Sequence, residues 1–172
     1  MFSPREPFLE RGWPGRIDGE NVIQLAAQTL QAFFTGGGQA REHAGYPLAD
    51  VVYRAPVLHP PSVRIFDNDE DFRFANPAAI KAVDEDLGVP AAEPVERVAA
   101  IIGADGAIGG FTPLVEWVAP ALAGAKQRDF ALTLGPVVTT PDEAVPPGVD
   151  WERLVAHAAE NTALYPGDLI VR

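Results

Sequence analysis

Two short apolar runs in the second half of the chain constrain its fold most strongly. Val98–Ile102 and Phe130–Thr140 are rich in branched apolar residues, and Gly, Asp or Pro residues bound both of them. Runs of this kind are typical of buried strands. Glu116 and Lys126 lie between them, close to a pair of glycines, so that an acid, a base and tight turns come together here. We therefore expect any functional site to lie in this stretch.

One segment near the N-terminus shows helical spacing instead. Val22–Phe34 carries apolar residues at positions 22, 25, 26, 30, 33 and 34. Asp18–Asn21 precedes it with turn-forming residues, and their acids suit the positive end of a helix dipole. The glycines Gly36–Gly38 are suited to end a helix. The spacing predicts a helix over 22–34.

The remaining predicted elements are mostly strands. A second helix is predicted over Trp151–Glu160, because Asp150 is a good capping residue and apolar residues recur on one side of the segment. Strands outnumber helices, which predicts a β-rich α+β fold with a mixed sheet. The predicted strands are Leu48–Tyr53, Ser62–Phe66, Phe72–Phe74 and Asp168–Val171, with a hairpin turn at Gly106–Gly110.

Length and charge exclude several classes of partner. The 172 residues suit one domain, and 13 Lys and Arg against 24 Asp and Glu give a net charge of −11. An acidic chain without a basic cluster repels phosphate, so we expect neither nucleic acid nor an anionic membrane surface as a partner. There is no cysteine, no apolar run approaching the ~18–20 residues of a membrane span and no secretory leader pattern. We expect a cytoplasmic protein.

Several familiar site patterns are absent. The acid-rich run Asp67–Asp71 lacks the central glycine of a calcium loop and is interrupted by Phe72, so we interpret it as a solvated loop. The two serines, Ser3 and Ser62, lie outside any G-x-S-x-G turn. The three histidines are scattered and do not have zinc-ligand spacing.

Four landmarks in order along the chain resemble the fumarylacetoacetate hydrolase family. They are VAAIIG at 98–103, GGFTPLVEW at 109–117, AKQRDFALTLGPVVTTPDE at 125–143 and LYPGDLI at 164–170. Upstream, RAPVLHPPSVRIF at 54–66 and FANPAAI at 74–80 resemble the segments that precede the family's core. The chain is similar to a shortened and divergent member of the family.

The resemblance implies a rolled, mixed β-sheet like the C-terminal domain of the family, assembled as a homodimer. It implies a lead-in segment with one helix over 1–50 and a fumarylacetoacetate hydrolase-like domain over 51–172. Family members bind Mg²⁺ or a similar ion, which polarises oxo or β-diketo acids during C–C hydrolysis, decarboxylation or tautomerisation. A small anionic substrate or ligand is therefore expected.

The residues matched to the family's metal site depart from its pattern. The two paired glutamates of the family pattern are matched in this chain by Val95 and Arg97, and a further acid of that pattern is matched by Ile65. The family aspartate is matched by Glu116 and its lysine by Lys126. Three of four expected carboxylates are absent, so no cofactor is expected beyond the Mg²⁺ that the resemblance alone implies.

Glu116 and Lys126 are the catalytic residues that the resemblance indicates, and Glu116 is the single remaining metal ligand. We expect Glu116 to form an ion pair with Arg97 and Lys126 that replaces the metal. Two functions stay open at this point. One is hydrolase or lyase chemistry on a small oxo acid with the metal site largely lost, and the other is a non-catalytic relative that binds an anion or assembles with a partner.

Overall fold

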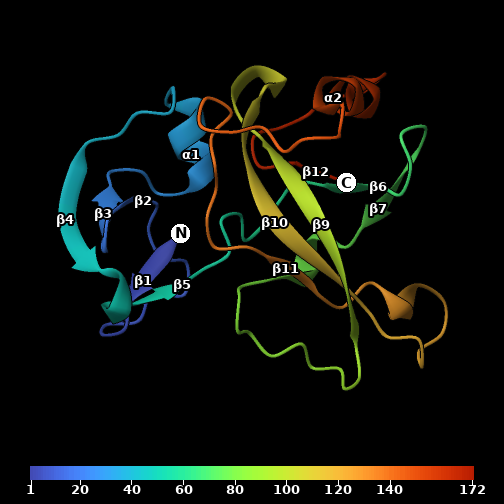
Figure 1. Ribbon diagram of the computed structural model, residues 1–172, viewed down its shortest axis with the longest axis horizontal. Helices are drawn as coiled ribbons and strands as arrows, with labels where there is room; N and C mark the ends of the chain where they lie inside the picture. Colours follow the sequence, from blue (N-terminus) through green and yellow to red (C-terminus); the bar gives the residue numbers. More distant parts are fainter.

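A seven-stranded mixed sheet forms the centre of the protein, as the computed structural model of residues 1–172 shows (Figure 1). Its strand order is β7-β6-β12-β9-β10-β11-β8. The β12–β6 and β11–β8 pairs are parallel and the others are antiparallel. This confirms the predicted β-rich α+β fold with a mixed sheet. The strands are β6 (Val63–Phe66), β7 (Phe72–Ala75), β8 (Ile80–Lys81), β9 (Glu93–Ile102), β10 (Ile108–Val118), β11 (Leu132–Leu134) and β12 (Leu169–Val171).

The first 53 residues form smaller sheets beside this large sheet (Figure 1). An antiparallel sheet joins β2, β3 and β4, and a separate strand pair joins β1 to β5. Their shared core contains Phe2, Val22 and Val51, which come from three different strands. The elements of these residues, which we call the N-terminal unit, are β1 (Phe2–Pro4), β2 (Gly15–Asp18), β3 (Asn21–Leu25), α1 (Leu30–Thr35), β4 (Glu42–Pro47) and β5 (Val51–Tyr53).

The helix predicted over 22–34 is wrong in its first half. Residues Asn21–Leu25 form β3, and only Leu30–Thr35 is helical, with Thr29 accepting a hydrogen bond from the Ala32 amide at its start and Gly36 at its end. The register of β3 against β4 shifts between Ile23 and Leu25. That bulge turns Val22 and Leu25 to the same buried side, so a strand reproduces the spacing of three that we interpreted as helical.

The other predicted elements are mostly present. The runs at 98–102 and 72–74 lie in strands, and the runs at 62–66 and 168–171 do so from their second residue. Helix α2 (Trp151–Ala159) begins at the predicted cap, where Asp150 accepts a hydrogen bond from the Arg153 amide. Two predictions were too long. Only Val51–Tyr53 of the run 48–53 and only Leu132–Leu134 of the run 130–140 are extended strands. None of the helices is long and apolar enough to cross a membrane.

The two faces of the seven-stranded sheet are covered differently. One face carries a core of 12 buried residues, of which nine come from β6, β9, β10, β11 and β12 and the others are Phe34 of α1 and Ala55 and Val57 after β5. Because strands from distant positions in the sheet share this core, the sheet curls around it, and we call this side the inner face. The outer face packs against α2 through Trp151, Leu154 and Ala158.

Candidate functional site: a buried carboxylate among arginines

Glu116 is a fully buried acid on the inner face of the sheet. Its side chain is 0% exposed. It lies two residues beyond the core residue Leu114 on β10 and is paired in register with Val95 of β9 and Leu132 of β11. Residues two apart on a strand share a face, so the carboxylate extends the apolar core of the inner face. A charged group in such a place needs close partners of opposite charge.

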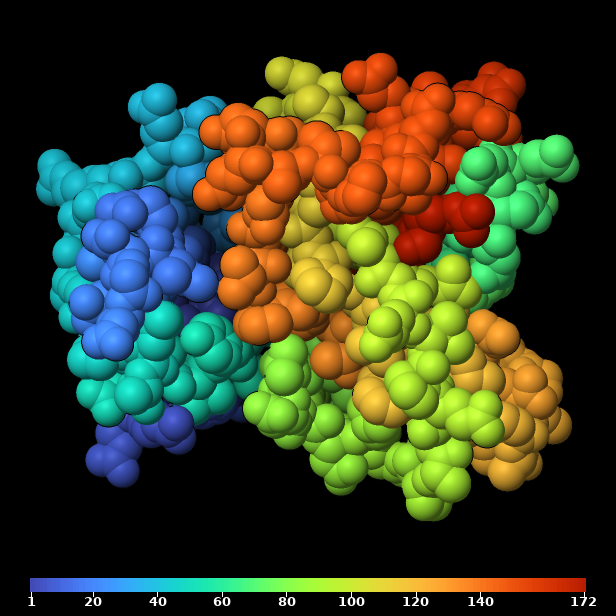
Figure 2. Space-filling view, in the orientation of Figure 1, coloured from blue at the N-terminus to red at the C-terminus, as the bar shows by residue number.

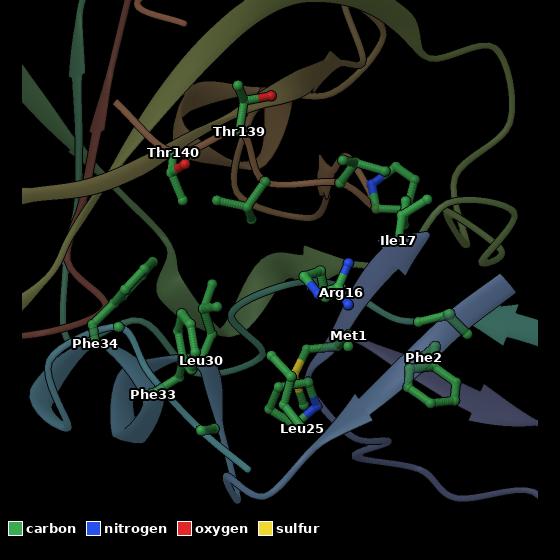
Figure 3. A pocket seen from close by; sticks show the side chains of 18 of the residues that line it. Met1, Phe2, Arg16, Ile17, Leu25, Leu30, Phe33, Phe34, Thr139 and Thr140 are labelled. Atoms are coloured by element: carbon green, nitrogen blue, oxygen red, sulfur yellow. The ribbon is translucent and has the colours of Figure 1, made fainter. Parts of the chain in front are cut away.

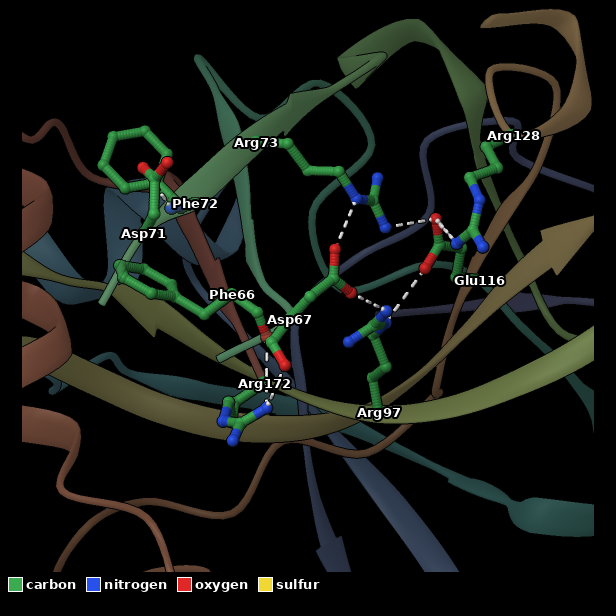
Figure 4. A network of polar contacts seen from close by, with 9 residues as sticks. All are labelled: Phe66, Asp67, Asp71, Phe72, Arg73, Arg97, Glu116, Arg128 and Arg172. Atoms are coloured by element: carbon green, nitrogen blue, oxygen red, sulfur yellow. Dashed lines mark hydrogen bonds and ion pairs between the residues drawn. The ribbon is translucent and has the colours of Figure 1, made fainter. Parts of the chain in front are cut away.

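Three arginines from separate segments supply those partners (Figure 4). The Nη2 of Arg73 on β7 lies 2.5 Å from Glu116 Oε1, and the Nη1 of Arg128 lies 3.1 Å from the same oxygen. The Nε of Arg97 on β9 lies 3.0 Å from Oε2. Both carboxylate oxygens are therefore engaged by guanidinium groups.

Asp67 joins two of these arginines from the end of β6. Its carboxylate accepts hydrogen bonds from Arg73 Nε at 2.9 Å and from Arg97 Nη2 at 2.5 Å. Partial burial acts to raise the pKa of Asp67, but the hydrogen bonds and charges of the two arginines outweigh it and lower that pKa below its ordinary value. Burial acts to lower the pKa of Arg73, but the hydrogen bonds and charges of Asp67 and Glu116 outweigh it and raise that pKa.

Charge remains after these contacts are counted. Arg73, Arg97 and Arg128 contribute three positive charges against two negative charges from Glu116 and Asp67, which leaves one positive charge. Solvent reaches the side chains of Arg73, 32% exposed, and Arg128, 44% exposed. Each arginine uses only one or two of its nitrogens within the cluster, so further N–H donors are available to an acceptor from outside.

The donor set does not fit a divalent cation. Mg²⁺ needs several oxygen ligands, yet the arginines already engage both oxygens of Glu116. No group of three or more His, Cys, Asp or Glu side chains is positioned to hold a metal ion. Three guanidinium groups also repel a cation at this position.

Comparison with known proteins was made by sequence and by structure. No family model and no curated protein matches the sequence. Maleylpyruvate hydrolase from Sphingobium sp. SYK-6 superposes with a TM-score of 0.75 at 19% identity, covering 94% of this chain and 85% of that chain. A 2-keto-3-deoxy-D-arabinonate dehydratase, complexed with magnesium and 2,5-dioxopentanoate, superposes with a TM-score of 0.71 at 15% identity, covering 95% and 84%.

Both enzymes are fumarylacetoacetate hydrolase family members. This chain has the fumarylacetoacetate hydrolase fold. The maleylpyruvate hydrolase was also solved in complex with a manganese(II) ion and pyruvate, and that structure likewise superposes with a TM-score of 0.75 at 19% identity. The resemblance noted in the sequence is confirmed at the level of the fold.

Within this fumarylacetoacetate hydrolase fold, one of the two predicted contacts of Glu116 is present. Arg97 contacts Glu116 as predicted. The predicted contact of Lys126 with Glu116 is wrong, because the Lys126 side chain is 76% exposed and its Nζ lies 2.8 Å from Asp129. The short 3₁₀ turn Gly124–Gln127 directs Lys126 outward, and Arg128 just beyond the turn contacts the glutamate instead. Catalytic roles for Lys126 and Glu116 stay predictions.

Three members of the cluster were missed in the sequence. Arg73 follows directly after Phe72 in a short apolar strand, Asp67 belongs to the acidic loop, and Arg128 lies in a polar turn. The register of β7 on β6, which pairs Arg73 with Ile65, is the feature that turns Arg73 toward the inner face. Ile65 is the position matched to a family acid, so the relevant signal was the cross-strand neighbour of that position.

Proposed function

We propose that this protein binds a small oxo-acid anion at the Glu116 cluster, with arginines in the place that a divalent ion takes in family members. One observation carries the proposal: three guanidinium groups converge on a single buried carboxylate and keep a net positive charge. Glu116 and Asp67 hold the arginines in position, so little side-chain conformational entropy is lost when a ligand binds. The metal-independent character of the site is part of this proposal.

The ligand class follows from the chemistry of the donors. Guanidinium groups form short, charge-assisted hydrogen bonds to carboxylates, often two at a time. The carboxylate and the neighbouring oxo oxygen of a 2-oxo acid can accept from two arginines at once. The pyruvate in the manganese complex of the similar maleylpyruvate hydrolase supports a ligand of this size.

Calorimetric titration with pyruvate and with oxaloacetate tests the binding proposal. We expect saturable binding without added metal. Arg128→Gln removes a half-exposed arginine that makes one contact in the cluster, and we expect the Kd to rise about tenfold, since a hydrogen bond to a charged group contributes roughly 1.5 kcal/mol. Arg41→Gln, at an exposed arginine outside the cluster, is the matched control and should leave the Kd unchanged. Equal affinities of the two variants would refute the proposal.

Turnover of such an acid is the second candidate function. Both similar structures are of enzymes, a hydrolase and a dehydratase, which favours hydrolase or lyase chemistry here. Within the cluster no acid is free to act as a base, because Glu116 is engaged on both oxygens and Asp67 has a lowered pKa. Lys126, exposed at the edge of this region, is the remaining residue that family resemblance assigns to catalysis.

An oxaloacetate or acylpyruvate assay separates the two functions. If turnover occurs and Lys126→Ala abolishes it while pyruvate binding persists, the protein is an enzyme and the lysine is catalytic. If neither substrate is converted but binding is retained, the protein is a non-catalytic anion-binding relative. Turnover that survives in Lys126→Ala would remove the lysine from the mechanism.

We also propose a homodimer, on the basis of family resemblance. Sedimentation velocity across a range of protein concentrations should give the mass of two chains. A single species with the mass of one chain at all concentrations would refute this proposal.

A further inference from the structure

An apolar cavity lies between the N-terminal unit and the segment 136–144, on the side of the molecule where β1, β2 and α1 approach the sheet (Figure 3). Its volume is about 760 Å³, within the range of cavities that hold small organic ligands. Figure 2 shows segment 136–144 in orange, lying beside the blue and cyan N-terminal unit. None of Asp67, Arg73, Arg97, Glu116 or Arg128 lines this cavity, so it is separate from the arginine cluster.

Hydrophobic residues make up 13 of the 23 that line the cavity. Leu30, Phe33 and Phe34 of α1 form one side (Figure 3). Two of the eight large apolar side chains that are exposed in this protein line the cavity, Ile17 at 44% and Val137 at 42%. Apolar surface that no protein group covers is favourable for binding an apolar ligand.

The charged side chains of the lining already have partners. Arg16 contacts Glu42 at 2.7 Å, and Glu143 accepts hydrogen bonds from the amide and hydroxyl of Thr140 at 2.9 and 3.0 Å. Burial lowers the pKa of the Met1 amino group, which belongs to a lining residue, to about 6, so this group is mostly neutral at pH 7. A charged ligand would therefore lose its hydration without gaining an unpaired charge opposite it. The lining therefore favours a neutral ligand. The Thr139 hydroxyl offers a hydrogen bond to one polar end of it, and the Thr140 hydroxyl, which donates to Glu143, can still accept one.

We propose that this cavity binds a neutral, largely apolar small molecule with a single hydroxyl or carbonyl end, such as a medium-chain alcohol. The site differs from the arginine cluster in its walls, its charge and its ligand class. Binding here does not depend on whether the cluster binds an oxo acid.

Fluorescence titration with the neutral probe N-phenyl-1-naphthylamine tests the proposal on the full chain. We expect one saturable site, from which 1-decanol displaces the probe at least tenfold more effectively than decanoate does. Val137→Arg and Ile17→Arg place a charge in the cavity from different segments at partly exposed positions, where folding should persist. Each should weaken probe binding at least tenfold, with circular dichroism and thermal midpoint unchanged.

Val145→Arg is the matched control, because Val145 is exposed at 53% and does not line the cavity. It should bind the probe like the unmodified protein. Absence of a saturable site, equal effects of the three arginine variants, or normal binding in both Val137→Arg and Ile17→Arg would overturn the proposal. Displacement by decanoate as effective as by 1-decanol would overturn the neutral ligand class.

Discussion

The arginine cluster and the apolar cavity differ in how far the chain's own side chains contact one another. At the cluster, a fully buried acid is surrounded by the chain's own arginines, and each charge has a partner within about 3 Å. At the cavity, apolar side chains from the N-terminal unit and from segment 136–144 face a space that no side chain fills. The first site keeps N–H donors on arginines that solvent reaches, whereas the second keeps apolar surface, so the two suit ligands of different chemistry.

The largest expected change in stability is at Glu116, the buried acid of the arginine cluster. Glu116→Gln removes the charge that holds three arginines together, and we expect the free energy of unfolding to fall by about 3–5 kcal/mol, because all three arginines lose their shared buried partner. Denaturant titration at neutral pH measures it. Glu143→Gln, at an exposed acid on the cavity, should change the same quantity by less than about 0.5 kcal/mol. A loss below about 1 kcal/mol in Glu116→Gln would mean that the cluster is not structurally important.

A smaller loss is expected where the cavity wall meets the sheet. A Cβ at Gly110 would collide with Val138 Cγ1 and would lie 3.0 Å from the Thr139 carbonyl oxygen. Gly110→Ala should lower the free energy of unfolding by about 1–3 kcal/mol and reduce naphthylamine binding, since it displaces segment 136–144. Gly45→Ala, whose Cβ would meet only the flexible tip of Ile23 at 3.2 Å, is the control. Unchanged stability and probe binding in Gly110→Ala would show that the wall is free to move.

Asp67→Asn should cost about 1 kcal/mol or less, because this acid is half exposed and solvent screens its contacts. The pKa of Asp67 is lowered in the folded state. Its contribution is therefore complete above the unfolded pKa of about 4 and is lost as pH falls through the lower folded value. Unfolding free energies of the two proteins should differ at pH 7 and converge in stronger acid. A difference that grows on acidification would contradict this sign.

The smallest effect is expected at the outer edge of the cluster. Lys126→Ala removes an exposed side chain paired only with Asp129, so thermal unfolding should show a change below about 0.5 kcal/mol. Pyruvate affinity should also be unchanged. A clear loss of pyruvate affinity would place Lys126 closer to the ligand than its ion pair with Asp129 indicates. A clear loss of stability would show that this ion pair is more than a weak surface contact.

Local patterns in the sequence predicted most of the large sheet. The branched apolar run Val98–Ile102 predicted the buried part of the longer strand β9, and Asp150 marks the start of α2 through its own side-chain hydrogen bond. The helix predicted from Val22 failed because a bulge in β3 reproduces helical spacing, and a bulge depends on the partner strand rather than on the segment itself.

The sequence predicted one contact of the arginine cluster and nothing of the cavity, because contacts between distant segments leave no local pattern. Arg97 and Glu116 lie on adjacent strands at positions matched to a known family pattern, and their contact was predicted. Arg73 and Arg128 reach Glu116 from 43 and 12 residues away along the chain, so they depend on register and on a turn that no local pattern specifies. The cavity joins residues of the first 53 positions to segment 136–144 and left no sequence signal.

An anomalous difference map from crystals grown with Mn²⁺ and pyruvate distinguishes anion from cation binding at the arginine cluster. We expect pyruvate with its carboxylate against Arg73, Arg97 or Arg128 and no manganese peak beside Glu116. A well-ordered Mn²⁺ coordinated by Glu116, with the arginines turned away, would contradict the replacement of the metal by guanidinium groups.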